Sequence, residues 1–198
     1  KLAIMAGAKN LGENYPEEGA QKISEICNPG VTWHMIGHIQ RRKTRIVAAH
    51  YDMVHSIDSL KLAVSLNNEC VKMHKVMPVL LEINVGGEES KGGWMITDID
   101  YEIACIEEIE QILDLNSLAV EGLMAMPPLH EDPEGSRQYF TKMRAIEEKL
   151  NRRFNNTFTE LSMGTSHDYT IAVQEGATYV RVGRSILGPR PAKKDQSS

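Results

Sequence analysis

Strand-like and helix-like segments alternate along the whole of this chain, and that alternation limits the possible folds more than any other feature. The strand-like segments are short and apolar, and we place them at residues 10–15, 32–37, 53–58, 79–85, 120–126, 159–164 and 179–187. Between them the sequence predicts helices at residues 16–27, 39–49, 59–75, 98–113, 133–153 and 167–176. Strands that alternate with helices in this way are typical of a parallel α/β sheet.

Two observations favour a closed barrel over a doubly wound sheet. No G-x-G-x-x-G motif opens the first strand–helix unit, so the usual marker of a dinucleotide fold is missing. Polar and chemically useful residues also recur at the carboxyl ends of the predicted strands, where (β/α)8 barrels collect their ligand-binding groups. These are Glu13 and Asn14, Gly37 and His38, Ser56 and Asp58, Glu82 and Asn84, Ser162 and Gly164, and Arg181 and Gly183. We predict a parallel, TIM-like (β/α)8 barrel that forms one domain over residues 1–198.

The predicted strands are one fewer than a closed eight-stranded barrel needs. The sequence opens at Lys1 in a stretch of helical composition, residues 2–8, with no strand ahead of it. Because a helix of such a barrel follows a strand, we expect this chain to lack the barrel's first strand. At the other end, residues 190–198 form a polar tail that we expect to be frayed.

Composition narrows the class of partner. The formal net charge of −5 and the aromatic content of 6% argue against a nucleic-acid-binding surface. The 3 cysteines include no C-x-x-C pair, which indicates a reducing compartment and gives no spacing for a metal site. No apolar run reaches the roughly 18–20 residues of a membrane span, and no signal peptide is visible. We expect a cytoplasmic, monomeric protein that binds a small molecule and no membrane.

The most informative segment is Leu-Ser-Met-Gly-Thr-Ser-His-Asp at residues 161–168. Strand character ends at Gly164, Thr165 or Ser166 is a natural helix N-cap, and Asp168 adds negative charge to the first helical turn. A glycine and small hydroxyl residues at such a turn let backbone N–H groups approach an anion at the positive end of the helix. For this turn alone, a plain helix cap without a ligand is the alternative.

A second segment, residues 179–188, strengthens the case for a phosphate site. If it is a strand throughout, Arg181, Gly183 and Ser185 share one face and two valines share the other. An arginine in an otherwise apolar strand needs a partner, because an unpaired buried charge costs several kcal/mol. Gly183 would let a ligand approach the backbone. Since the last two strands of a (β/α)8 barrel supply its recurrent phosphate site, the two segments together predict an anion pocket.

These two segments, with Gly-Glu-Asn-Tyr at 12–15 and Trp-His-Met-Ile-Gly-His-Ile-Gln at 33–40, closely resemble one family. It is the pyridoxal phosphate homeostasis protein family, whose barrel is similar to the N-terminal domain of alanine racemase. The resemblance continues through residues 56–58, 88–92 and 122–124 and covers nearly the whole chain. It implies a barrel of PLP fold type III, without a second domain, that binds pyridoxal 5′-phosphate (PLP).

In the family, the Ser-Met-Gly-x-Ser loop and the Arg-x-Gly segment hold the cofactor. The resemblance places Arg181 opposite the pyridine nitrogen of PLP. A guanidinium stays protonated, so it would keep that nitrogen unprotonated and weaken the ring as an electron sink. The resemblance also places Asn14 at the polar edge of the ring, and it assigns the phosphate to Ser162, Gly164, Thr165, Ser166, Gly183 and Arg184.

The sequence departs from the family pattern at three places. The family's PLP-bonding lysine lies on the first strand, in a segment that would precede residue 1, so we expect no catalytic residue within this chain. Neither Lys1 nor Lys9 falls at the carboxyl end of a predicted strand. Thr165 stands where methionine is frequent, and Pro-Glu-Glu at 16–18 replaces a more usual Val-Gln-Glu. We expect both of these changes to be tolerated.

The resemblance favours a PLP-binding protein of intracellular vitamin B6 and amino-acid homeostasis, without an established turnover reaction. A PLP-dependent amino-acid racemase is the alternative. A racemase similar to alanine racemase needs a second domain, whereas about ten residues follow Gly188, which weighs against it. A third possibility is a PLP-independent barrel enzyme that acts on a phosphorylated metabolite.

Three further polar side chains have both a structural and a functional interpretation. His34, between Trp33 and Met35, is favoured as a core or barrel-lining histidine. His55 precedes Ser-Ile-Asp at 56–58, but a catalytic Ser/His/Asp set has no nucleophile elbow here, and we do not favour it. Glu82 would line the ligand cavity or belong to a buried hydrogen-bonded layer.

Overall fold

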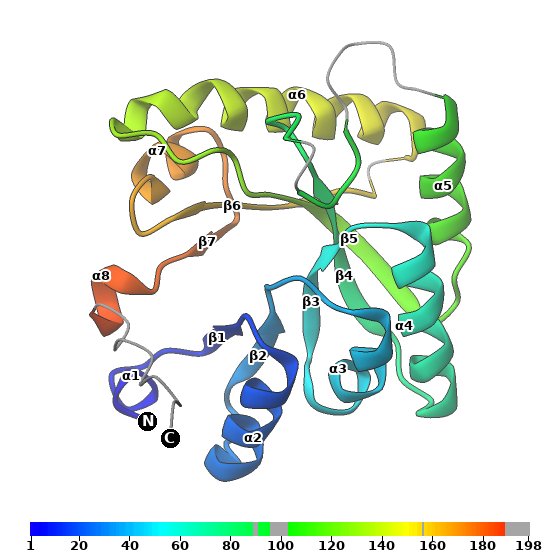
Figure 1. Cartoon of the computed structure of the whole chain (residues 1–198), viewed down its shortest axis with the longest axis vertical. Coiled ribbons are helices and arrows are strands. Elements are labelled where there is room, and N and C mark those ends of the chain that lie inside the picture. Colours follow the sequence, from blue (N-terminus) through cyan, green and yellow to red (C-terminus); the bar gives the residue numbers. More distant parts are fainter. Residues whose placement is uncertain (89–90, 96–102, 156, 189–198) are drawn as a thin grey trace, which may run out of the picture.

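The structure, a computed structural model, describes residues 1–88, 91–95, 103–155 and 157–188. Its strands are β1 (Asn10–Glu13), β2 (Thr32–Met35), β3 (Met53–Ile57), β4 (Met77–Ile83), β5 (Leu118–Ala125), β6 (Glu160–Thr165) and β7 (Tyr179–Arg181). They form one 7-stranded sheet in sequence order, and every neighbouring pair is parallel. The sheet curves into a nearly closed barrel (Figure 1), which confirms the predicted fold class.

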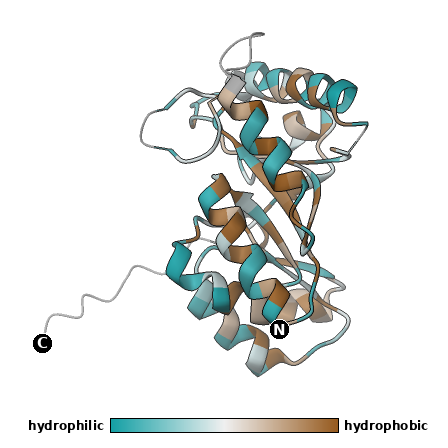
Figure 2. Cartoon of the chain, turned by 90° about the vertical axis from the view of Figure 1, so that its right-hand side faces the viewer, coloured by the Kyte–Doolittle hydropathy of each residue, from teal (hydrophilic) through white to brown (hydrophobic). Residues whose placement is uncertain are grey.

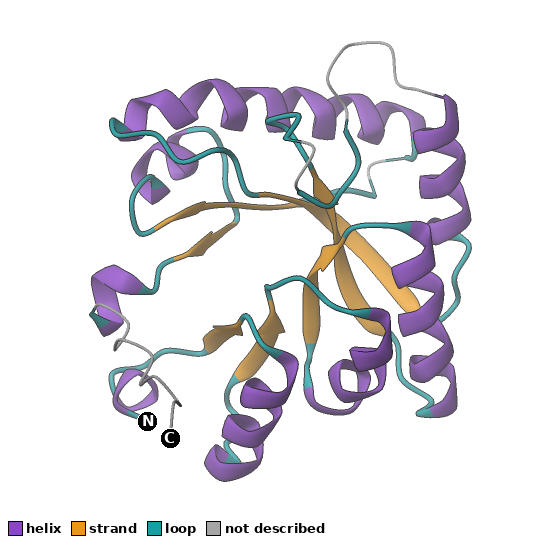
Figure 3. Cartoon of the chain, in the orientation of Figure 1, coloured by secondary structure: helices purple, strands orange, loops and turns teal. Residues whose placement is uncertain are grey.

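After α1, which precedes β1, the helices follow the strands and lie outside the sheet, as Figure 3 shows. They are α1 (Leu2–Met5), α2 (Pro16–Ile26), α3 (Thr44–His50), α4 (Leu60–Lys72), α5 (Ile103–Leu113), α6 (Arg137–Arg153), α7 (Tyr169–Gln174) and α8 (Arg184–Leu187), with 3-10 turns η1 (Arg41–Lys43) and η2 (Pro133–Ser136). The start expected for the helix at 98–113 and the tail at 190–198 lie outside the described residues. Among the described residues, no helix combines the length and the apolar character that a membrane span requires.

The strands β1 and β7 are the two edges of the sheet and do not pair with each other in the described part of the chain. Figure 1 shows them facing each other across the opening of the barrel, with α1 and α8 beside it. Every other strand has a neighbour on both sides. The carboxyl ends of β6 and β7 therefore lie next to this opening.

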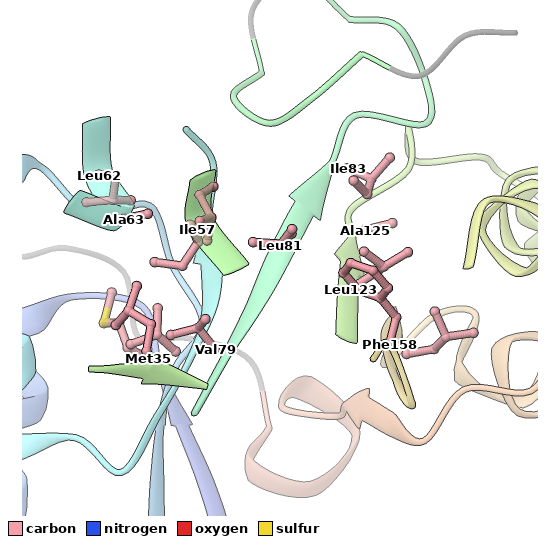
Figure 4. Packing of buried hydrophobic residues seen from close by; sticks show 14 of the residues in the cluster. Met35, Ile57, Leu62, Ala63, Val79, Leu81, Ile83, Leu123, Ala125 and Phe158 are labelled. Carbon is pink, nitrogen blue, oxygen red and sulfur yellow. The ribbon is translucent and has the colours of Figure 1, made fainter. Parts of the chain in front are cut away.

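The main core lies between the outer face of the sheet and the helices. Figure 4 shows buried side chains of several strands, among them Val79 and Leu81 of β4 and Leu123 of β5, and places Leu62 of α4 on the side of β3. The helices accordingly carry apolar residues on one side and hydrophilic residues on the other (Figure 2). Alternation along each strand leaves the other set of side chains for the inside of the barrel.

The barrel interior holds a second, smaller apolar cluster. It consists of Met53, Leu80 and Met124, with Tyr179 of β7 packed against them. Polar side chains share this inner face, because His55 and Glu82 each lie two residues beyond a cluster member on the same strand. The inside of the barrel is thus apolar at the height of Met53, Leu80 and Met124 and becomes polar toward the carboxyl ends of the strands.

The predicted strand at 179–187 is wrong beyond Arg181. Strand β7 stops at that residue, and residues 184–187 form α8, whose N-cap is Gly183. Ser185 therefore does not share a strand face with Arg181. The sequence misleads because Val182, Ile186 and Leu187 have strand-like composition, whereas Ile186 and Leu187 are 68% and 73% exposed in the structure. Apolar residues favour a strand because they pack on a buried sheet surface. Ile186 and Leu187 have no such packing, so their apolar character does not favour a strand over a helix.

Candidate functional site

Arg181 ends β7, and neutral oxygen atoms hold its guanidinium at the barrel interior. Nη1 donates to the carbonyl oxygen of Ser162 at 2.8 Å and to its hydroxyl oxygen at 2.7 Å, and Nη2 donates to the carbonyl oxygen of Ala125 at 2.8 Å. Burial lowers the pKa of Arg181 to about 10, against the opposing effect of the Glu82 and Asp168 carboxylates. The group stays a cation at neutral pH, and its charge is available to a ligand.

A row of polar side chains continues from Ser162 across the barrel through two buried histidines to the exposed Asn10. Ser162 Oγ lies 2.9 Å from Nδ1 of His55, His55 Nε2 lies 2.9 Å from Nδ1 of His34, and His34 Nε2 lies 3.0 Å from Oδ1 of Asn10. The serine and the two histidines are 0%, 2% and 4% exposed. The ring of Tyr179 packs against both imidazoles, with centroids 5.1 and 5.6 Å away.

Both imidazoles of this row are neutral at neutral pH. Burial, together with the smaller effects of the neighbouring His34 and Arg181, lowers the pKa of His55 to about 3. Burial also lowers the pKa of His34, against the opposing effect of Asp52. The barrel-lining interpretation of His34 is confirmed, because the side chain is buried and hydrogen-bonded.

Ser166 joins the loop after β6 to the loop after β7. Its Oγ accepts hydrogen bonds from the backbone N–H groups of Gly183 at 3.1 Å and Ser185 at 3.3 Å. A Cβ atom added at Gly183 would meet no atom within 4 Å, so there is open space against this backbone. Both N–H groups already have Ser166 Oγ as their acceptor, and the hydrogen of the Ser166 hydroxyl is the donor that this arrangement would offer to an anion.

Packing against α7 explains why residue 164 is a glycine, and hydrogen bonds to Asp168 explain how Thr165 forms the turn. Gly164 has a φ of +86°, and a Cβ atom there would lie 2.5 Å from the Cβ of Ala172 in α7. The carboxylate of Asp168 accepts hydrogen bonds from the Thr165 backbone N–H at 2.7 Å and hydroxyl at 3.1 Å. The predicted cap at Thr165 or Ser166 is wrong, because β6 runs to Thr165 and Asp168 is the N-cap of α7.

Asn14 and Arg184 lie apart from this cluster. Asn14 follows β1 at the other edge of the sheet, and Gly37 packs against its backbone. Arg184 begins α8 and is exposed. In the described part of the chain, neither side chain forms a hydrogen bond with Ser162, Ser166 or Arg181. Their roles toward a ligand stay predictions.

Glu82 extends the polar inner face toward the carboxyl ends of the strands. Burial and the neighbouring Asp58 carboxylate raise its pKa, while His38, Arg181 and Lys91 act in the opposite direction. Its neighbours are thus the titratable groups at the ends of several strands, as the barrel prediction requires. No three His, Cys, Asp or Glu side chains of the described residues are grouped so that they could hold a metal ion.

Sequence reasoning missed His55 as part of this site. Its partner Ser162 lies 107 residues away in the sequence, on a strand that is not a neighbour of β3 in the sheet. The available signal was the alternation along β3, which places His55 on the same inner face as Met53. The curvature of the sheet into a barrel, rather than any local motif, brings the two side chains together.

The fold and the site define a class of protein. The model of the alanine racemase N-terminal domain matches residues 1–191. An alanine racemase from Clostridium difficile has the same fold, with a TM-score of 0.73 and 14% identity, over 97% of this chain and 47% of the racemase. The chain is therefore a barrel of the alanine racemase N-terminal class.

Comparison with similar proteins identifies the family within that class to which the chain belongs. The pyridoxal phosphate homeostasis protein of Aquifex aeolicus is 38% identical over 185 residues, which are 93% of this chain and 78% of that protein. The protein of the same name from Escherichia coli is 35% identical over 195 residues, 97% of this chain and 80% of that protein. PipY of Synechococcus elongatus, solved with PLP bound, has a TM-score of 0.83 and 31% identity, over 94% of this chain and 85% of PipY. The chain belongs to the pyridoxal phosphate homeostasis protein family.

Proposed function

We propose that this protein binds PLP at the carboxyl ends of β6 and β7 and serves intracellular PLP and amino-acid homeostasis without a turnover reaction of its own. Its relatives carry the name of that function, and the PipY relative was solved with PLP bound. The observation that carries the proposal is Arg181, a desolvated cation beside the loops that Ser166 joins. We further propose that the protein acts in the cytoplasm as a monomer and binds no nucleic acid.

The residues present fit the ring of PLP. Arg181 would face the pyridine nitrogen, and because a guanidinium only donates hydrogen bonds, that nitrogen would accept one and stay unprotonated. PLP supplies an electron sink when it is bound, and an unprotonated ring is a weaker one. Ser162 would hold Arg181 rather than touch the ligand, since its hydroxyl is fully buried against Arg181 and His55. Asn14 would approach the ring from the β1 edge.

The residues present also fit the phosphate group. The N–H of Gly183 donates to Ser166 Oγ, and the hydrogen of that hydroxyl would be donated to a phosphate oxygen in the open space beside Gly183. Gly164 and Thr165 would shape the turn that carries Ser166. Arg184, exposed at the start of α8, would add positive charge from the outside.

Replacement of Arg181 by alanine tests the proposal. We expect Arg181→Ala to raise the dissociation constant of PLP by about 10- to 100-fold, because a hydrogen bond to a charged group contributes about 1.5–3 kcal/mol. Equilibrium dialysis with detection of PLP absorbance measures the effect. Arg153→Ala is the matched control, because Arg153 pairs with Glu110 on the outer helices, 2.7 Å away.

Unchanged PLP affinity in Arg181→Ala would remove the proposed site. Competition by inorganic phosphate separates PLP from other phosphorylated ligands. We expect pyridoxal without phosphate and inorganic phosphate each to bind more weakly than PLP, because each engages only one part of the site. If phosphate alone bound as tightly as PLP, the site would be a general phosphate site, as in the barrel enzymes that use no PLP.

A further inference from the structure

The row that runs from Arg181 through the buried Ser162, His55 and His34 to the exposed Asn10 has a direction that the chemistry of its Arg181 end determines. We propose that His55 and His34 are positioning residues, which hold the Arg181 guanidinium in place through hydrogen bonds that all run the same way. The inference rests on the proposed PLP site, because it concerns the residue that would face the pyridine nitrogen.

The direction follows from the donors and acceptors along the row. A guanidinium can only donate, so Ser162 Oγ accepts from Arg181. The hydroxyl hydrogen of Ser162 then needs an acceptor, and in the described part of the chain His55 Nδ1 is the atom placed to accept it. A neutral imidazole whose Nδ1 accepts carries its hydrogen on Nε2. His55 therefore donates to Nδ1 of His34, and His34 Nε2 donates to Oδ1 of Asn10.

The opposite direction leaves one buried group without a partner. It would require Asn10 to present its amide nitrogen to His34, and each imidazole to carry its hydrogen on Nδ1. Ser162 Oγ would then accept from both Arg181 and His55, and its own hydrogen would have no acceptor among the described residues. Ser162 is 0% exposed, so water cannot replace that partner. An unsatisfied buried donor is unfavourable, whereas the first direction satisfies every group.

This arrangement orients Arg181 in two ways. Three hydrogen bonds to Ser162 and Ala125 engage part of the guanidinium, and of its five N–H groups two remain for a ligand. The neutral row also keeps a second positive charge away from Arg181. Because the row crosses from β7 through β6, β3 and β2 to β1, the guanidinium is fixed relative to nearly the whole barrel.

Histidine tautomers test the direction without any substitution. Nitrogen NMR of the imidazole rings, recorded on the protein without PLP at neutral pH, reports which nitrogen of each ring carries the hydrogen. We expect His55 and His34 both to be neutral, with the hydrogen on Nε2. A hydrogen on Nδ1 of His55, or an imidazolium at either position, would overturn the proposal.

Variants at position 55 test the effect on the ligand. Phenylalanine fills the space of the imidazole but accepts no hydrogen bond, so we expect His55→Phe to weaken PLP binding about tenfold. In His55→Asn, the amide oxygen can take the place of Nδ1, so we expect it to restore affinity to within about threefold of the original. Thr44→Val is the control for a lost buried hydrogen bond, because Thr44 lies in α3 and bonds to Arg41 and Ser65.

The outcomes separate this inference from the proposed function. If Arg181→Ala weakens PLP binding and folded His55→Phe binds PLP like the original protein, the positioning role is wrong and the PLP site stands. If both variants keep the original affinity, the proposed function fails. If His55→Phe does not fold, the NMR tautomers and the recovery in His55→Asn decide the question.

Discussion

At the scale of the residue, Gly164 and Gly183 are glycines for different reasons. Gly164 has a positive φ, and its hydrogen faces the Cβ of Ala172, so helix α7 could not pack as it does against any larger residue. Gly183 has an ordinary negative φ of −114° and open space beside its backbone. One glycine is required by the fold, and the other by the proposed ligand.

Alanine at each position separates the two requirements. Gly164→Ala should lower the free energy of unfolding by about 1–3 kcal/mol, because the new methyl group meets Ala172 in a strained backbone conformation. Gly183→Ala should change it by less than about 0.5 kcal/mol, as for a substitution into open space, and should weaken PLP binding. Urea unfolding and equilibrium dialysis measure the two effects. A Gly183→Ala variant with full PLP affinity would contradict the place we give the phosphate.

At the scale of the element, the loop after β1 is held by the loop after β2. Gly37 packs so closely against Asn14 that a Cβ atom there would collide with the Asn14 backbone. The pairing of β1 with β2 runs from Asn10 and Thr32 to Glu13 and Met35, one residue before Asn14 and two residues before Gly37. The position of Asn14 therefore depends on the strand pairing and on the lack of a side chain at Gly37.

Gly37→Ala should displace the Asn14 backbone, because neither the sheet nor the loop can yield without breaking hydrogen bonds. We expect a loss of about 1–3 kcal/mol in the free energy of unfolding and weaker PLP binding. Gly30→Ala is the control glycine, since a Cβ atom there meets a side-chain oxygen of Asn28 at 3.3 Å. If Gly37→Ala matched Gly30→Ala in PLP affinity, Asn14 would have no part in the site.

Local sequence was sufficient to predict the alternation of elements but not every boundary. The strands up to β6 fall within a few residues of their predicted places, and the central ones, such as β3 and β4, combine β-branched residues with burial on the sheet. Segment 179–187 was mistaken for one strand, since α8 is short and its apolar residues are exposed. Arg181, Ser166 and Gly183 were singled out from their types and order, and their roles toward a ligand, which the resemblance implies, stay predictions. The contact of Ser162 with His55 depends on the curvature of the sheet into a barrel, which no local pattern encodes.

At the scale of the whole molecule, the row from Arg181 to Asn10 makes stability depend on pH. In the folded protein the pKa of His55 is lowered to about 3, whereas in the unfolded chain it is near the ordinary value of 6.5. Above pH 6.5 the imidazole is neutral in both states and contributes no pH dependence. Below it, the unfolded chain binds a proton that the folded protein does not bind until about pH 3, so stability falls as the pH falls.

From pH 7 to pH 5 we expect His55 to lower the free energy of unfolding by about 2 kcal/mol. The lowered pKa of His34 acts in the same direction. The raised pKa of Glu82 acts in the opposite direction, because the folded state takes up that proton first. Urea unfolding of the original protein and of His55→Asn at each pH isolates the contribution of His55, since asparagine does not titrate. The variant should lose about 2 kcal/mol less than the original over this interval, and equal losses would mean that His55 is not held neutral by the row.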